Sequence, residues 1–284
     1  MAYECSKSAN VGVVAALIMS VIPAHMMRSV GGGYDNESVA ISAMVGTFYF
    51  WVRSMRNPSS WYWGAVAGVC YVYMVAAWGG YVFVLNMVGC HAFVLVILGR
   101  HSTKLHRAYS LFYLIGTYGA IHVPVVGWTP LKSLEQLPCL GIFLGIQLME
   151  LCDVIKRRSK LNDKETQRLR IKVFGVAAVL GAIVVATVVP TGYFGPISSR
   201  IRGLFLKHTR TGNPLVDSVA EHQPASNRAY FQYLHTMCYY APIGFVITVG
   251  NLTDANLFLV LYAIVAYFFS AKMVRLVLLM GPIA

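Results

Sequence analysis

The sequence predicts an all-α fold, namely a polytopic transmembrane helical bundle with about nine spanning helices and a long external loop. Three observations support this. Of the 284 residues, 57% are hydrophobic and 12% charged, and the mean hydropathy is +0.60. The apolar residues fall into long runs, and most of the basic residues lie between them. A soluble domain of this length cannot bury so much apolar surface, so a membrane protein is expected.

The apolar runs are each about 20 residues long, which is the length a helix needs to cross a bilayer core. The third and fourth runs are separated by Gly79 and Gly80, which favour a tight reversal over one long helix. The nine predicted spans cover residues 10–29, 38–55, 61–78, 80–99, 108–127, 137–155, 173–192, 229–250 and 256–280.

The basic residues indicate how the chain is oriented. If the nine spans alternate, one side of the membrane receives fourteen Lys and Arg residues and the other receives seven. The side with fourteen is expected to be cytoplasmic, because Lys and Arg near membrane spans stay there. The segment 193–228 then forms a long loop on the opposite, external side. The net charge of +12 comes from basic residues that lie mainly between the apolar runs, as is typical of membrane proteins, so no nucleic-acid partner is expected.

Two carboxylates on the external side follow a run of glycines. Asp35 and Glu37 come directly after Gly31, Gly32 and Gly33. In an extended turn these carboxylates project to the same side, and the glycines allow positive φ and close approach to a ligand. The pair suits a hard divalent cation that also takes phosphate oxygens. Alternatively, Asp35, Asn36 or Ser38 is the N-cap of the next helix, and this segment alone favours a cap over a metal site.

Two other residues have open interpretations. Arg275 lies in the last apolar segment, where an arginine is costly and usually faces a cavity or partner; it could bind phosphate, or reach towards lipid headgroups. Glu221, in SVAEHQP, is by itself a solvated loop carboxylate, and its neighbour His222 adds only a weak indication of a metal site.

Four stretches together resemble the catalytic subunit of eukaryotic oligosaccharyltransferase. They are MRSVGGGYDNESVAI, YVYMVAAWGGYVFVLN, NPLVDSVAEHQPA and SAKMVRLVLLMGP. The resemblance implies a GT-C-type fold and an inverting, metal-dependent transfer of a preassembled oligosaccharide. The donor would be a dolichyl pyrophosphate, and the acceptor the Asn of N-x-Ser/Thr sequons in nascent proteins. It also implies the endoplasmic reticulum membrane, a lumenal active side, contact with membrane lipid, and other subunits as partners.

The same resemblance assigns roles to individual residues. Asp35, Glu37 and Glu221 would be catalytic and would hold Mg²⁺ or Mn²⁺. Arg275 would bind the lipid pyrophosphate, and Arg28 would support the acidic loop. Two family features, a first acidic loop and a lumenal C-terminal domain with a WWDYG motif, are absent from these 284 residues. Residues 1–284 are therefore expected to form a partial transmembrane catalytic domain.

Three alternatives remain at this stage. The chain could be another GT-C glycosyltransferase that uses a lipid-linked sugar, although SVAEHQP argues against this. It could be a cation transporter with Asp35 and Glu37 at its entrance, but transporters carry carboxylates near the bilayer midplane. It could also be an inactive fragment that binds lipid or partners without chemistry.

Overall fold

The computed structural model describes residues 1–194 and 219–283, and within them the regular elements are all helices. The first half comprises α1 (Ala2–Ser6), α2 (Ala9–Val21), α3 (Pro23–Met26), α4 (Asn36–Ser54), η1 (Ser60–Tyr62), α5 (Trp63–Ala77), α6 (Tyr81–Ile97), α7 (Thr103–His122) and α8 (Thr129–Lys132). The second half comprises α9 (Leu137–Ser159), α10 (Asp163–Val188), η2 (Val189–Thr191), η3 (Ala220–His222), α13 (Asn227–Leu234), α14 (Met237–Val249), α15 (Asp254–Lys272) and η4 (Val274–Met280).

Polar side chains fix where several long helices begin. Ser102 accepts a hydrogen bond from the Leu105 amide at the start of α7, and Thr253 accepts one from the Asn256 amide at the start of α15. Asn162 begins α10 with a capping box that includes Glu165. Such caps satisfy backbone N–H groups that have no partner within the helix.

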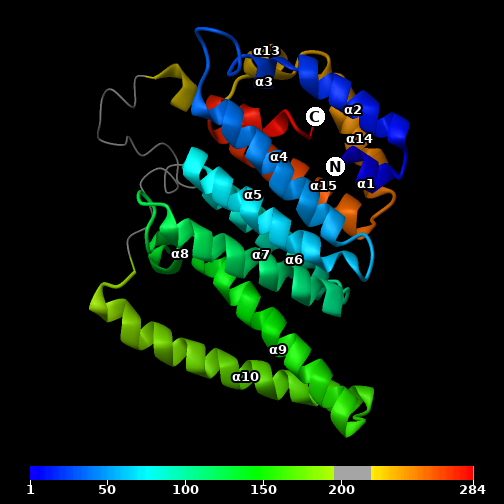
Figure 1. Ribbon diagram of the computed structural model, residues 1–284, viewed down its shortest axis with the longest axis vertical. Helices are drawn as coiled ribbons and strands as arrows, with labels where there is room; N and C mark the ends of the chain where they lie inside the picture. The colour runs from blue at the N-terminus through cyan, green and yellow to red at the C-terminus, as the bar shows by residue number, and fades with distance from the viewer. Residues whose placement is uncertain (195–218, 284) are drawn as a thin grey trace.

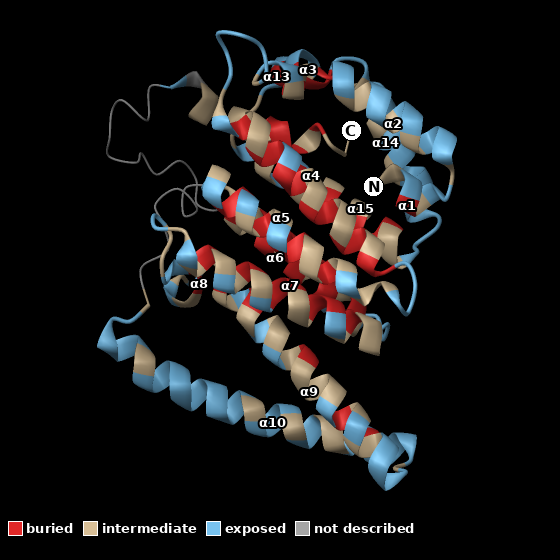
Figure 2. Ribbon diagram, viewed as in Figure 1, coloured by how far each residue is buried: buried red, intermediate tan, exposed pale blue. Residues whose placement is uncertain are grey.

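The core lies between α4, α5, α6, α7 and α15, where Figure 2 shows most of the buried residues. Aromatic rings fill its centre. Phe48 packs edge-on against Phe258 and Tyr262, with ring centroids 5.0 and 5.1 Å away. The buried Trp51 donates to His91 Nδ1 at 3.0 Å. Edge-to-face aromatic pairs of this kind add stability beyond that of the buried area alone.

Small residues let the helices of the bundle approach closely. A Cβ atom at Gly64 of α5 would lie 2.4 Å from the carbonyl oxygen of Ala108 on α7. A Cβ atom at Gly116 of α7 would lie 2.8 Å from the ring of Tyr71 on α5. These two glycines therefore set the distance between α5 and α7, as small residues commonly do in membrane helix pairs.

Membrane crossing is indicated for part of the bundle. Among the described residues, three helical segments are long and apolar enough to span a bilayer: Leu137–Ser159, Asp163–Thr191 and Asp254–Lys272. Shorter apolar helices cover Ala9–Val21, Tyr81–Ile97 and Met237–Val249. Each of the nine predicted segments contains a helix, but nine spans remain a prediction. In Figure 1, α10 diverges from the bundle, and Figure 2 shows it largely exposed.

Three predicted segments are broken where the sequence suggested continuous helices. In residues 229–250, α13 ends at Leu234 and α14 begins at Met237. In residues 10–29, α2 ends at Val21, and Ile22 is extended because it precedes Pro23. In residues 256–280, α15 ends at Lys272 and Met273 is extended, with φ −151° and ψ 127°. Arg275 therefore lies in η4 rather than within the last apolar helix, which corrects the expectation from the hydropathy pattern.

Charged residues gather at both ends of the bundle. Asp35 precedes α4 at one end, and Met55 follows it at the other, where its carbonyl accepts from Lys104 Nζ at 2.6 Å. At this second end Arg100 contacts Asp254 at 3.3 Å. The 19 residues of α4 separate the two ends by about 28 Å, close to the thickness of a bilayer core.

Candidate active site

The connection between α3 and α4 folds back on itself and presents the acidic pair. The Asp35 amide donates to the Arg28 carbonyl at 3.2 Å, and the Gly33 amide donates to the Val30 carbonyl at 3.0 Å. Gly32 adopts a φ of +84°, a conformation that glycine tolerates without strain. The loop therefore brings Arg28 next to Asp35, seven positions later in the sequence.

Asp35 is an N-cap and also faces the site. Its Oδ1 accepts from the Asn36 amide at 2.7 Å, which begins α4. Its Oδ2 lies 3.7 Å from Arg28 Nη1 and 3.8 Å from Arg275 Nη2. The two interpretations of Asp35 left open by the sequence are therefore compatible, because each oxygen serves a different role.

Arg28 contacts all three of the predicted site carboxylates. Its Nη2 donates to Glu221 Oε1 at 2.6 Å, its Nε lies 3.2 Å from Glu37 Oε2, and its Nη1 faces Asp35. Burial of its side chain, which is 17% exposed, disfavours the charged form, but the charges of Glu37 and Glu221 outweigh this and raise the pKa of Arg28. Arg28 thus lies among the three carboxylates, and its role in supporting the acidic loop stays a prediction.

Arg275 approaches the same carboxylates from the other end of the chain. Its Nε donates to Glu37 Oε1, and its Nη2 faces Asp35. Glu37 is only 1% exposed and lies between the two guanidinium groups. Burying a carboxylate costs free energy unless it is paired, and here two guanidinium groups pair with Glu37.

A backbone contact joins the two C-terminal pieces of the site. The amide of Val274, next to Arg275, donates to the carbonyl of Gln223, two residues after Glu221, at 2.9 Å. The extended Met273 makes this amide available, since it lies outside α15. The helix break missed by the sequence analysis thus places Arg275 beside the segment that carries Glu221.

Tyr233 of α13 is a site residue that sequence reasoning missed. It is 7% exposed, and burial raises its pKa, with a further rise from the charge of Glu221 and an opposing effect from Arg28. No motif marks this tyrosine. Its position becomes evident only once α13 packs beside α3 and η4.

The proposed metal ligands gather around Arg28, but their oxygens are not among the described groups of three ligand atoms that lie within 4.8 Å of one another. Asp35, Glu37 and Glu221 all contact Arg28. Their oxygens are the ligands a hard cation prefers, and Glu37 Oε2 is a buried oxygen that accepts no hydrogen bond from the described residues. The donor set therefore fits a divalent ion chemically. Part of the external loop predicted at 193–228, namely residues 195–218, lies outside the described residues.

Comparison with known proteins identifies the family. The family model "Oligosaccharyl transferase STT3, N-terminal" matches residues 4–283. The STT3 subunit of the dolichyl-diphosphooligosaccharide–protein glycosyltransferase of Dictyostelium discoideum is 38% identical over 282 residues, covering 98% of this chain and 39% of the relative. The corresponding subunit of Saccharomyces cerevisiae is 33% identical, covering 98% of this chain and 38% of the relative. The chain thus spans less than half the length of these curated relatives.

Solved structures share the fold. The oligosaccharyltransferase AglB of Archaeoglobus fulgidus, in complex with an inhibitory peptide and a dolichol-phosphate, superposes with a TM-score of 0.68 at 14% identity. The match covers 95% of this chain and 34% of AglB. A structure of the A. fulgidus enzyme with Zn and sulfate gives a TM-score of 0.62 at 12% identity, covering 96% of this chain and 32% of that enzyme. From the matched family model and these curated relatives, we conclude that the chain belongs to the oligosaccharyl transferase STT3 family.

Proposed function

We propose that this chain forms the membrane-embedded catalytic part of an oligosaccharyltransferase. It would transfer a preassembled oligosaccharide from dolichyl pyrophosphate to the Asn of N-x-Ser/Thr sequons in nascent proteins, with inversion at the anomeric carbon. The main support is the convergence of Arg28, Asp35, Glu37, Glu221 and Arg275 at one end of the bundle. Because the chain belongs to the STT3 family, glycan transfer is the reaction that we propose first.

Glu221 is suited to activate the acceptor amide. A carboxamide nitrogen is a poor nucleophile, because its lone pair is delocalised over a bond with a rotation barrier of about 18–20 kcal/mol. A carboxylate that accepts an amide N–H can help to rotate this bond out of plane. The side chain of Glu221 is 38% exposed, so an acceptor can reach it, and Arg28 fixes Oε1.

Arg275 is suited to hold the lipid pyrophosphate. Its described contacts use Nε and Nη2, and among the described residues Nη1 has no ion-pair partner. Its side chain is 30% exposed. A guanidinium group can therefore bind a phosphate oxygen while it stays paired with Glu37. This arrangement would stabilise the negative charge that develops on the leaving group.

The same carboxylates would hold the metal ion. We assign Asp35, Glu37 and Glu221 as its ligands, with Mg²⁺ or Mn²⁺ as the ion. When bound, such an ion would offset charge on the departing pyrophosphate. The site would face the lumen of the endoplasmic reticulum, because the end with fewer Lys and Arg residues carries it. Membrane lipid and other oligosaccharyltransferase subunits would be partners.

A cation transporter fits the site less well. The described carboxylates of the site gather at the end of α4 and in η3 rather than in the middle of a span. An inactive fragment is the other alternative, and only an assay can exclude it.

The test joins this chain to the N-terminal and C-terminal portions of the Saccharomyces cerevisiae relative that it does not match, and assays glycan transfer to a fluorescent N-x-Thr peptide. We expect transfer with the wild-type chain, loss of at least a hundredfold for Glu221→Gln and Arg275→Lys, and little change for Glu135→Gln. Chelation should abolish transfer, and Mg²⁺ or Mn²⁺ should restore it. A chimera that assembles and binds the donor but transfers nothing would support the inactive alternative.

A further inference from the structure

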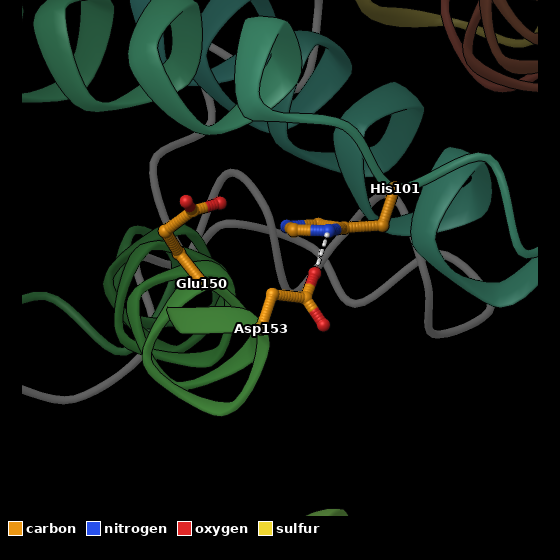
Figure 3. Close-up of side chains that lie close together, drawn as sticks. All are labelled: His101, Glu150 and Asp153. Carbon is orange, nitrogen blue, oxygen red and sulfur yellow. Dashed lines mark ion pairs between the residues drawn. The ribbon is translucent and has the colours of Figure 1, made fainter. Parts of the chain in front are cut away.

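A second group of ionisable side chains lies at the opposite end of the bundle from the candidate active site. His101 belongs to the connection between α6 and α7, whereas Glu150 and Asp153 lie about one turn apart on α9 (Figure 3). One ligand atom from each lies within 4.8 Å of the others. Among the described residues, this is the one group of three or more His, Cys, Asp or Glu side chains with such spacing.

Asp153 holds the imidazole of His101 in one orientation. Asp153 Oδ2 lies 3.3 Å from His101 Nδ1, and Asp153 Oδ1 accepts from Arg170 Nη2 of α10 at 2.6 Å. When Nδ1 carries the proton and donates it to Asp153, the lone pair of the ring is on Nε2. Histidines that bind metals are commonly oriented by a carboxylate in this manner.

Two buried acceptors remain without a partner. His101 Nε2 and Glu150 Oε2 are both buried, and neither forms a hydrogen bond with the described part of the chain. The side chain of His101 is only 7% exposed, and Figure 3 shows the ring with its second nitrogen directed towards Glu150. A lone pair and a carboxylate oxygen cannot satisfy each other, so both need a hydrogen-bond donor or a cation between them.

The charges around the cluster can adjust to a bound cation. Burial lowers the pKa of His101, against the raising effect of Asp153 and Glu150, and Arg170 lowers it further. Arg157, which contacts Glu150 Oε1 at 2.8 Å, is 60% exposed and can turn into solvent when a cation arrives.

We propose that His101 Nε2 and Glu150 form a site for a divalent transition-metal ion of the zinc class, with Asp153 holding the imidazole from its Nδ1 side. An imidazole nitrogen and a carboxylate suit a borderline ion better than Mg²⁺, which prefers oxygen ligands and keeps its waters. The ion would join the α6–α7 connection to α9 and, through the Asp153–Arg170 pair, to α10. It would thus fix the base of the diverging α9–α10 hairpin.

The experiment titrates Zn²⁺ into the purified 284-residue chain in detergent, with excess Mg²⁺ present to occupy all-oxygen carboxylate sites. Calorimetry gives stoichiometry and affinity, and the visible absorption of bound Co²⁺ separates nitrogen and oxygen ligation from thiolate ligation. We expect one ion per chain without thiolate bands, and a rise in the unfolding temperature on binding. His101→Gln and Glu150→Gln should each weaken binding at least tenfold.

His106→Gln is the matched control. His106 is a nearby, partly buried histidine of α7 whose Nε2 pairs with Gln147 at 2.8 Å, and its loss should leave the affinity unchanged. Far-UV circular dichroism checks that each variant keeps its helices, and if His101→Gln does not, Glu150→Gln decides. The proposal is overturned if the folded wild-type chain binds Zn²⁺ only at millimolar concentration, or if the folded variants bind it as the wild type does.

Discussion

Glu37 is the residue on which the geometry of the candidate site depends most. It is 1% exposed and contacts Arg28 through one oxygen and Arg275 through the other. Its neighbour Asn36 begins α4 and donates from Nδ2 to the carbonyl of Ala77 at 2.8 Å. Neighbouring residues of the YDNE motif therefore have different roles. Glu37 pairs with the arginines of the site, and Asn36 begins α4 and binds it to α5.

Replacing Glu37 with Gln should disrupt this arrangement. The change removes the charge that offsets two partly buried guanidinium groups, at an expected cost of about 2–3 kcal/mol in stability. We expect a lower unfolding temperature in detergent, and transfer by the chimera reduced at least tenfold. Glu135→Gln serves as the control. An unchanged unfolding temperature would show that the arginines do not depend on Glu37 for their charge balance.

Asn36 should carry no glycan, although Asn36-Glu37-Ser38 has the sequon pattern. Its amide nitrogen is engaged by Ala77, and the next residue, Glu37, is buried. Mass spectrometry of the protein from a eukaryotic host should find this asparagine unmodified. A glycan at Asn36 would mean that the loop between α3 and α4 leaves the site.

At the scale of helices, the arrangement of the bundle depends mainly on close packing between helices and on where the helices end. The α5–α7 pair depends on glycines that no side chain can replace without moving the backbone. The break at Met273 is of equal importance, since it lets Val274 bond to Gln223 and turns Arg275 towards Glu37. A helix continued through residue 280 would have used the Val274 amide within itself.

Gly64→Ala should therefore destabilise the bundle. The new methyl group would meet the backbone of Ala108 at 2.4 Å, and a backbone atom cannot rotate away, so an overpacking cost of about 1–3 kcal/mol is expected. Gly141→Ala on α9 is the matched control, because nothing lies within 4 Å of its Cβ position. It should be neutral or slightly stabilising, since alanine favours helices. Equal unfolding temperatures for the two variants would contradict the close contact.

The whole molecule is organised by its two charged ends, which lie on either side of the apolar bundle. One end carries the candidate active site, and the other carries Arg100, Lys104 and the His101 cluster. The turn between α14 and α15 belongs to the second end, because the carbonyl of Leu252 accepts from Arg100 at 2.9 Å.

This arrangement predicts that Asn251-Leu252-Thr253, a second sequon, faces the cytoplasm. Under the proposed function, glycan transfer takes place on the opposite side of the membrane, so Asn251 should be unmodified in a eukaryotic host. A cysteine placed at Asn251 should react with a membrane-impermeant thiol reagent added outside intact microsomes, because their outer face is the cytoplasmic one. A glycan at Asn251 would reverse the proposed orientation.

The sequence by itself determined the class of the protein and the members of its candidate site. The hydropathy pattern predicts a membrane environment, because repeated apolar runs of about 20 residues match the thickness of a bilayer core. The quoted motifs identified Arg28, Asp35, Glu37, Glu221 and Arg275. Only the tertiary structure decided how these residues pair, because the partners lie 193 positions apart for Arg28 and Glu221 and 238 apart for Glu37 and Arg275. Sequence periodicity indicates which face of one helix is apolar. Contacts between distant segments, such as those of Tyr233 and His101, form only when the helices pack together.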